Sequence, residues 1–166
     1  MAIRKIVTLG DETLRKECRR EEKFGLRLAL LLKDMAETMY KAEGVGLAAP
    51  QVGILRRVVV IDAGEESNGL VELINPEILE VEGEQCGREG CLSLPGRQAI
   101  VTRPRKVKVR AQDRKGEFFE LEAENLFARA ICHELDHLEG RLYIDVMDRE
   151  LTPEEIEGHV PEDDNE

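Results

Sequence analysis

This sequence of 166 residues has no long hydrophobic run and no excess of basic over acidic residues. Its longest uninterrupted apolar run is Leu28 to Leu32, whereas a membrane span needs about 20 such residues. The first residues, Met1 to Lys5, lack the apolar block of a secretory signal. We therefore expect a chain that neither spans a membrane nor is exported, and that stays in the cytoplasm.

The net charge is −11, so no basic surface for nucleic acid is indicated. Much of the excess lies in residues 150–166, which contain 8 acidic residues and no lysine or arginine. The length is typical of one domain. We expect a single catalytic domain over residues 1–150, followed by an acidic tail, residues 151–166, that is partly disordered.

Cysteine and histidine are scarce, which limits the possible metal sites. The cysteines are Cys18, Cys86, Cys91 and Cys132. Because none of them forms a Cys-x-x-Cys pair, a structural zinc knuckle is not expected, and in a reducing compartment they are thiols. The histidines are His133, His137 and His159. Any site built on histidine must therefore use nearly all of them.

The spacing of apolar and turn residues predicts an α+β fold with antiparallel strands. An amphipathic helix is expected over residues 26–42 and a second helix over residues 124–139, ended by Gly140. Asp11 is the expected N-cap of a short helix. The expected strands are residues 57–62, 70–74, 77–82, 106–112 and 117–122. One short helical turn is expected after residue 152.

The strongest indication of chemistry is His133-Glu134-Leu135-Asp136-His137, within the second expected helix. Residues four apart lie on one face of a helix, so both imidazoles can point toward one metal ion. Glu134 lies beside them, where a carboxylate can take a proton from metal-bound water. This segment predicts two metal ligands and a general base.

A catalytic site of this type needs a third protein ligand. One known pattern requires a histidine where this sequence has Tyr143, and is excluded. Glu157 has the spacing of a second pattern, and His159 is also available, but both lie in the acidic tail. Cys91, in a rigid segment rich in glycine and proline, is the third candidate. Judged from the residues alone, Cys91 could equally be a buried thiol that packs as a small hydrophobe.

Residues 44–53 form a third unusual segment, rich in glycine and containing Pro50. Its Gly-x-Gly-x-x-Ala pattern indicates dinucleotide binding only after a strand, and here a helix is expected before it. That function is excluded. What remains is a tight loop with one polar side chain, Gln51. It could cap backbone groups of the loop or donate a hydrogen bond to a developing oxyanion.

Taken together and in this order, the three segments resemble the motifs of the peptide deformylase family. The motifs stand here as residues 44–51, as Glu89-Gly90-Cys91-Leu92-Ser93, and as residues 133–137. The resemblance continues from residue 11 to residue 145, nearly the whole chain before the tail. It implies antiparallel β-sheets wrapped around a central helix that carries residues 133–137, with an amphipathic helix near the N-terminus.

The resemblance also implies which residues hold the metal. Cys91, His133 and His137 would be the ligands. Bacterial members of the family typically use Fe(II), which is therefore the expected native metal, and zinc, nickel or cobalt can take its place. A pair between Glu89 and Arg103 would fix the cysteine segment. Two unpaired surface charges are the alternative.

The implied reaction is hydrolysis of the N-formyl group from nascent polypeptides that begin with formylmethionine, with release of formate. Metal-bound hydroxide would attack the formyl carbon, with Glu134 as general base and then general acid. Gln51 and the backbone N–H of Leu92 would stabilise the oxyanion.

The same resemblance implies an apolar pocket for the methionine side chain, and a peptide that adds as a strand beside it. The implied substrate-binding residues are Val45, Gly46, Gly90, Leu126 and Ala130, together with the flank of His133.

Two other functions remain open, a zinc peptidase with Glu157 or His159 as third ligand, and a non-catalytic homologue that binds N-termini. The expected partners are N-formylmethionyl peptides. A transient ribosome contact would use a surface other than the acidic tail, because phosphate repels carboxylates. Neither DNA nor membrane binding is expected.

Overall fold

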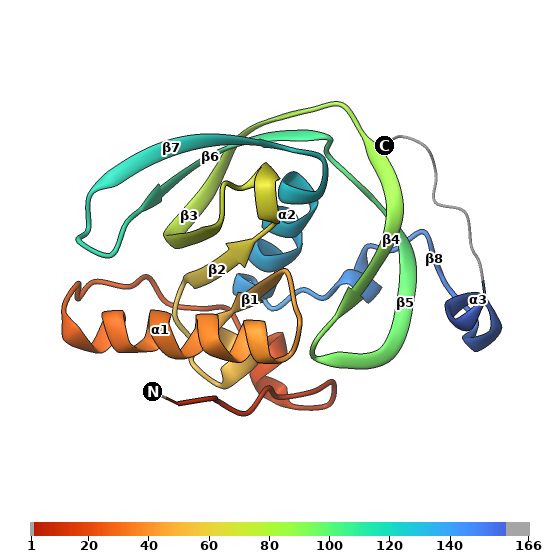
Figure 1. The fold of residues 1–166 in the computed structure, drawn as a ribbon, viewed down its shortest axis with the longest axis horizontal. Helices are drawn as coiled ribbons and strands as arrows, with labels where there is room; N and C mark the ends of the chain where they lie inside the picture. Colours follow the sequence, from red (N-terminus) through yellow and green to blue (C-terminus); the bar gives the residue numbers. More distant parts are fainter. Residues whose placement is uncertain (1, 159–166) are drawn as a thin grey trace.

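The computed structural model describes residues 2–158, which form two antiparallel sheets and three α-helices (Figure 1). The strands are Gly46–Ala48 (β1), Val58–Asp62 (β2), Leu70–Glu82 (β3), Gln85–Cys91 (β4), Leu94–Arg103 (β5), Lys106–Gln112 (β6), Phe118–Glu124 (β7) and Arg149–Glu150 (β8). The helices are Leu26–Lys41 (α1), Asn125–Leu138 (α2) and Pro153–Glu157 (α3). Within residues 2–158, no helix is long and apolar enough to cross a membrane.

The sheets differ in size and are joined through the central helix. One has the order β1-β2-β3-β6-β7, and the other has the order β4-β5-β8. In Figure 1, α2 lies between the larger sheet and the β4–β5 hairpin. The expected α+β class, with antiparallel sheets around a central helix, is confirmed.

Helix α2 is buried on nearly all sides, which suits a helix at the centre of a domain. Eleven of its 14 residues are buried. Its apolar side chains, among them Phe127, Ile131 and Leu138, pack against inward residues of the larger sheet. The polar residues that it also buries must therefore find partners inside the protein.

Helix α1 covers the opposite face of the larger sheet, over β1 and β2, with a single apolar stripe. Leu28, Leu32, Met35 and Met39, spaced three and four apart, are buried against Val58 and neighbouring residues of β1 and β2. The helix expected over residues 26–42 is confirmed. So is the short helix with Asp11 as N-cap, whose carboxylate accepts a hydrogen bond from the Thr13 backbone nitrogen at 2.9 Å.

The two strands expected over residues 70–74 and 77–82 are one strand, β3. The pairing with β6 shifts register between Ile74 and Glu77. Asn75, at a φ of 52°, and Pro76 stand at this irregularity. The bulge lets the strand continue past residues that do not favour a ladder.

Strands β4 and β5 were not expected, and the segment around Cys91 is the tight connection between them. Cys91 pairs with Leu94 in register. The inward residues of β4 are Gln85, Gly87 and Glu89, so the alternation of apolar side chains that marks an ordinary half-buried strand is missing.

The end of the described chain folds back onto the smaller sheet. Leu151 is 4% exposed, and Glu150 pairs with Ala99 of β5. Helix α3 follows, with Thr152 as its N-cap, which confirms the expected short helical turn. The disorder expected farther along concerns residues 159–166, which lie outside the described part of the chain.

Gly140, just after α2, leads to a prediction about the stability of the protein. Gly140 has a φ of 76°, and a Cβ there would lie 2.5 Å from the Arg15 carbonyl oxygen. Gly140→Ala should lower the free energy of unfolding by about 3 kcal/mol, through strain and backbone collision. Urea denaturation measures this. The control is Gly64→Ala, with a φ of 67° and open space around it, which should cost about 1 kcal/mol. Equal losses would contradict the prediction.

Candidate metal centre

Three potential ligands from two elements meet in the interior. His133 and His137 lie one turn apart on α2, and Cys91 ends β4. Their donor atoms all lie within 4.8 Å of one another, and Cys91 Sγ is 3.4 Å from His137 Nε2. Two ligands of one tetrahedral zinc-type ion are separated by about 3.5 Å. One sulfur and two imidazole nitrogens at these distances fit a first-row divalent metal ion.

A buried carboxylate fixes the orientation of the first imidazole. Glu89 Oε1 is 2.9 Å from His133 Nδ1, which leaves His133 Nε2 to face the cysteine. Burial would lower the pKa of His133, but hydrogen bonds to Cys91 and Glu89 raise it. A carboxylate on the remote nitrogen fixes the tautomer of a ligand histidine and makes it a better donor.

Glu89 is itself held by two arginines. Arg103 donates Nε to Glu89 Oε2 at 2.8 Å and Nη2 to Oε1 at 2.9 Å, and Arg129 Nη1 lies 2.7 Å from Oε2. Burial would raise the pKa of Glu89, but hydrogen bonds from Arg103 and His133 outweigh it and hold the pKa well below its usual range. The pair expected between Glu89 and Arg103 is confirmed. Arg103 also binds Asp136 of α2 at 2.8 Å.

The second imidazole has the opposite electrostatic setting. Burial and the positive charges of His133 and Arg103 lower the pKa of His137 well below its ordinary value. The neutral imidazole is the form that binds a metal. His137 Nδ1 is buried and has no hydrogen-bond partner among the described residues.

Glu134 is buried next to these ligands. It is 5% exposed, and its Oε1 has no hydrogen-bond partner in the described part of the chain. Gly46 of β1 makes room for it, because a Cβ at Gly46 would lie 2.6 Å from Glu134 Oε2. Burial raises the pKa of Glu134 to about 7, against the opposing charge of His133. A carboxyl group of this kind can both accept and release a proton near neutral pH.

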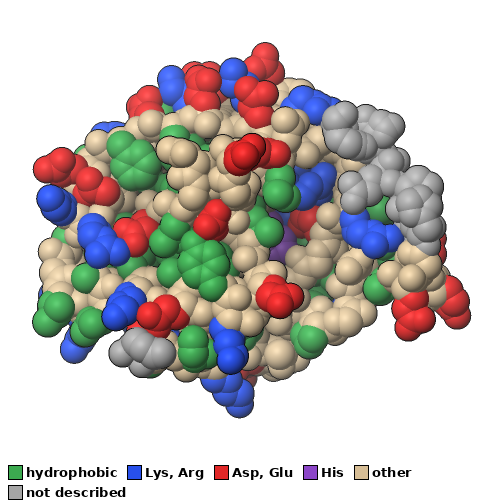
Figure 2. Space-filling model, in the orientation of Figure 1, with side chains coloured by type: hydrophobic (Ala, Val, Ile, Leu, Met, Phe, Trp, Pro, Cys, Tyr) green, Lys and Arg blue, Asp and Glu red, His purple; other side chains and the backbone are tan. Residues whose placement is uncertain are grey.

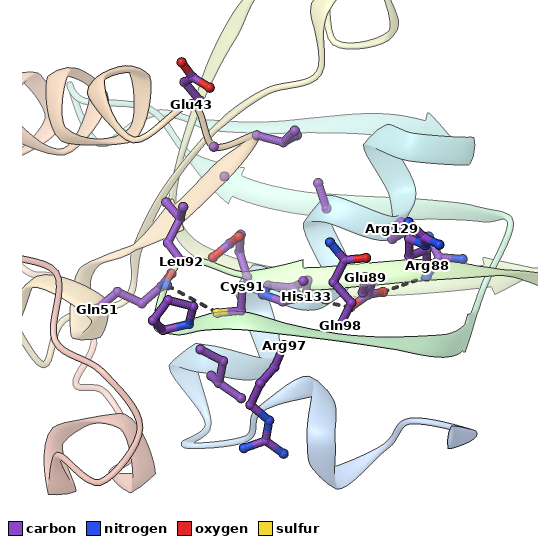
Figure 3. A pocket seen from close by; sticks show the side chains of 18 of the residues that line it. Glu43, Gln51, Arg88, Glu89, Cys91, Leu92, Arg97, Gln98, Arg129 and His133 are labelled. Atoms are coloured by element: carbon purple, nitrogen blue, oxygen red, sulfur yellow. Dashed lines mark hydrogen bonds and ion pairs between the residues drawn. The ribbon is translucent and has the colours of Figure 1, made fainter. Parts of the chain in front are cut away.

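Gln51 reaches the centre from the glycine-rich loop. Its Oε1 accepts a hydrogen bond from the Ala48 backbone nitrogen at 3.0 Å, and its Nε2 donates to Ser93 Oγ at 3.1 Å and to Cys91 Sγ at 3.6 Å (Figure 3). The oxygen therefore caps the loop while the amide N–H₂ faces the cysteine. The two roles considered for Gln51 use opposite ends of one amide. Leu92 follows Cys91 directly.

A cavity of about 490 Å³ opens beside the potential metal ligands. In the space-filling view, a histidine is visible inside a hollow that both hydrophobic and charged side chains surround (Figure 2). The residues expected to bind substrate, Val45, Gly46, Gly90, Leu126 and Ala130, all line the cavity. Val45 and Leu126 are 37% and 43% exposed, whereas Ala130 is 8% exposed, which indicates that the first two lie at the rim.

Sequence reasoning missed Arg129, which also lines the cavity and is 8% exposed. The sequence did contain a signal, because Arg129 follows Leu126 by three residues and precedes His133 by four, the spacing of one helical face.

The structure gives no support to the two candidates for a metal ligand in the tail. Glu157, in α3, is not part of the only cluster of metal-binding side chains found among the described residues. His159 lies beyond those residues.

Comparisons with known proteins agree with one another. A family model described as polypeptide deformylase matches residues 3–152. A peptide deformylase from Caldicellulosiruptor bescii is 58% identical over 157 residues, covering 95% of this chain and 93% of the relative. Peptide deformylase 1 from Clostridium acetobutylicum is 61% identical over 147 residues, covering 89% and 96%. The crystal structure of peptide deformylase from Thermotoga maritima matches with a TM-score of 0.86 and 44% identity, covering 89% of this chain and 99% of that one.

The contact between Glu89 and His133 predicts a dependence of metal affinity on a residue that touches no metal. Glu89→Gln should weaken zinc binding about 10-fold to 100-fold, because the His133 ring loses its charged acceptor. Competition with a chromophoric chelator measures the affinity. The matched control is Glu139→Gln at the exposed pair with Arg57, which should leave it unchanged. Equal affinities in the two variants would count against the role given to Glu89.

Proposed function

The chain belongs to the polypeptide deformylase family, and we propose how its own residues carry out the family's reaction. It is a metal-dependent hydrolase that removes the formyl group from formylated nascent peptides. One observation carries the assignment of residues. Cys91, His133 and His137 converge beside the buried carboxyl group of Glu134, whose Oε1 has no hydrogen-bond partner among the described residues. We assign these three residues as metal ligands.

The metal is assigned by the chemistry of its ligands. When bound, a divalent ion supplies Lewis-acid chemistry, which lowers the pKa of water and polarises the formyl oxygen. We propose Fe(II) as the native ion, with zinc, nickel or cobalt able to replace it. One sulfur and two imidazole nitrogens suit several of these ions, so the ligands alone support all four metals. The resemblance to the family is what favours Fe(II) among them.

Glu134 is the proposed general base and general acid. Its carboxylate accepts a proton from the attacking water and delivers it to the departing amine as the C–N bond breaks. The pKa near 7 that burial gives Glu134 supports both steps, because neither form is strongly favoured at neutral pH. Gly46 leaves the space that this carboxyl group fills, because a Cβ there would collide with it.

Negative charge that develops on the formyl oxygen needs donors already in position. Gln51 Nε2 and the backbone N–H of Leu92 are the proposed donors. The hydrogen bond from Ala48 to Gln51 Oε1 supports this role, since it fixes the amide with its N–H₂ toward Cys91. The N–H that points to Cys91 Sγ at 3.6 Å would turn to the formyl oxygen, while the other stays on Ser93 Oγ.

The cavity is the proposed binding site for the methionine side chain, with Val45 and Leu126 at its rim and Ala130 deeper. Strands β1 and β4 are each the outer strand of their sheet. A peptide can therefore pair with the free edges at Gly46 and Gly90, as an added strand. Backbone pairing is independent of side chains, which suits an enzyme that acts on many different nascent chains.

The setting of the reaction in the cell follows from its substrate. We infer a cytoplasmic enzyme with a catalytic domain over residues 1–150 and an acidic tail over residues 151–166. Because nascent chains emerge at the ribosome, a transient contact there is proposed, through a surface other than the acidic tail, which ribosomal phosphate would repel.

Replacing the proposed general base tests the reaction and the base together. Glu134→Gln keeps the volume of the buried side chain but cannot take a proton. It should lower formate release from a formyl-Met tripeptide at least about 100-fold, while nickel still binds one ion per chain. The protein is purified without oxygen and loaded with nickel. Full activity in the variant would exclude Glu134 as the base, and no release by the wild type would overturn the proposed function.

The third ligand separates this proposal from a peptidase with a ligand in the tail. Cys91→Ser should abolish tight metal binding and formate release, because the site loses its sulfur donor. The double variant Glu157→Ala with His159→Ala should keep both. Metal content after dialysis and formate release are measured on each protein. Metal retained by the serine variant and lost by the double variant would favour the peptidase.

A further inference from the structure

One face of α2 forms a wall of the substrate cavity and carries an unexpected charge. Leu126, Arg129, Ala130 and His133 follow one another at helical spacing and all line the cavity. An apolar pocket for methionine explains the leucine and the alanine, and the metal explains the histidine. Arg129, which is 8% exposed, supports Glu89 through one nitrogen, but neither the pocket nor the metal accounts for the other nitrogens of its guanidinium group.

The guanidinium of Arg129 is fixed in position. Its Nη1 donates to Glu89 Oε2 at 2.7 Å and to the Val101 carbonyl oxygen at 3.1 Å. Gly87 makes room for it, since a Cβ there would lie 3.3 Å from Nη2. In Figure 3, Arg129 and Gln51 lie at opposite ends of the view, with Cys91 between them. Arg129 therefore occupies the end of the cavity farther from Gln51.

Two donor nitrogens of Arg129 remain. Among the described residues, no group accepts a hydrogen bond from Nε or Nη2. A donor that loses water without gaining a partner costs free energy. A hydrocarbon side chain in the cavity offers no acceptor, and a thioether sulfur is only a weak one. An oxygen near the end of the bound side chain would satisfy these donors.

We propose that Arg129 extends the substrates of this site to formyl peptides whose first side chain carries a hydrogen-bond acceptor at the position of the sulfur, above all methionine sulfoxide. Oxidation of methionine adds one oxygen to that sulfur and makes the side chain polar. An apolar pocket would strip water from this oxygen and give it no donor, whereas Arg129 supplies one.

The inference rests on the proposed function and leaves its chemistry unchanged. Water adds to the formyl carbon, the C–N bond breaks, and formate and a free amine are released. The sulfoxide takes no part in the reaction. The site would thus process chains whose initiator methionine has been oxidised, without first reducing it.

Wild-type protein loaded with nickel gives the first measurement. Formate release is compared for tripeptides that begin with formyl-Met, formylnorleucine and each epimer of formylmethionine sulfoxide. For the better epimer, kcat/KM should lie within 10-fold of the methionine value, because the oxygen exchanges a bond to water for one to Arg129. A larger deficit for both epimers would overturn the inference while leaving the proposed function intact.

Variants then test whether Arg129 is responsible. Arg129→Met removes the donors, and Arg129→Lys keeps a positive charge beside Glu89, so that a folded protein is available if the methionine variant is unstable. Arg129→Met should lower the sulfoxide-to-methionine ratio of kcat/KM at least 10-fold, and Arg129→Lys, whose single ammonium pairs with Glu89, should lower it by a smaller factor. Both should change the norleucine-to-methionine ratio less than 3-fold. A sulfoxide ratio that stays at the wild-type value in the folded variants would overturn the inference.

Arg103→Lys is the matched control. Arg103 binds the same carboxylate but is not among the residues that line the cavity. Its replacement should lower kcat/KM for all the peptides together and leave their ratios unchanged, which separates contact with the side chain from support of Glu89. An equal fall of the sulfoxide-to-methionine ratio in the Arg103 variant would overturn the proposed contact between Arg129 and the sulfoxide oxygen. If the wild-type protein releases formate from none of the peptides, the proposed function is overturned, and this inference with it.

Discussion

The buried carboxylate of Glu89 is the constraint on which the site depends. It lies on β4, and its partners are Arg103 of β5 and Arg129 and His133 of α2. A charge in the interior is tolerated only with good geometry and full hydrogen bonding. Since all of these partners converge on two oxygens, the hairpin can approach the helix in only one way. That approach brings Cys91, two residues farther along β4, to the histidines.

Space for the functional side chains comes from glycines on strands rather than from gaps in the core. Gly46 leaves room for the Glu134 carboxylate, and Gly87 for the Arg129 guanidinium. Both glycines lie on the outer strand of a sheet, where a missing side chain lets another element come close to the backbone. The same openings leave the strand edges free for a peptide. The glycines thus connect the positioning of the buried charges with access to the site.

The two long helices and the strands β2, β3, β6 and β7 could be predicted from the sequence because apolar side chains recur along them at the period of their structure. Strand β1, only three residues long, lies in the segment that was expected to be a loop. Strand β4 could not, since its inward residues serve a hydrogen-bond network instead of a core. The histidine pair was predicted because both ligands lie on one helix. Cys91 comes from a segment more than 40 residues away, so spacing alone left it undecided and only the resemblance favoured it.

The proposed metal ligation and the proposed contact with substrate would be coupled, because both use one face of α2. Arg129 and His133 are one turn apart on α2 and contact the two oxygens of the same carboxylate, Oε2 and Oε1. A bound group that accepts a hydrogen bond from the Arg129 guanidinium would also affect Glu89 and, through Glu89, the His133 imidazole. Buried networks of this kind respond as a unit. The carboxylate that would orient the metal ligand is therefore also the one that fixes the guanidinium beside the cavity.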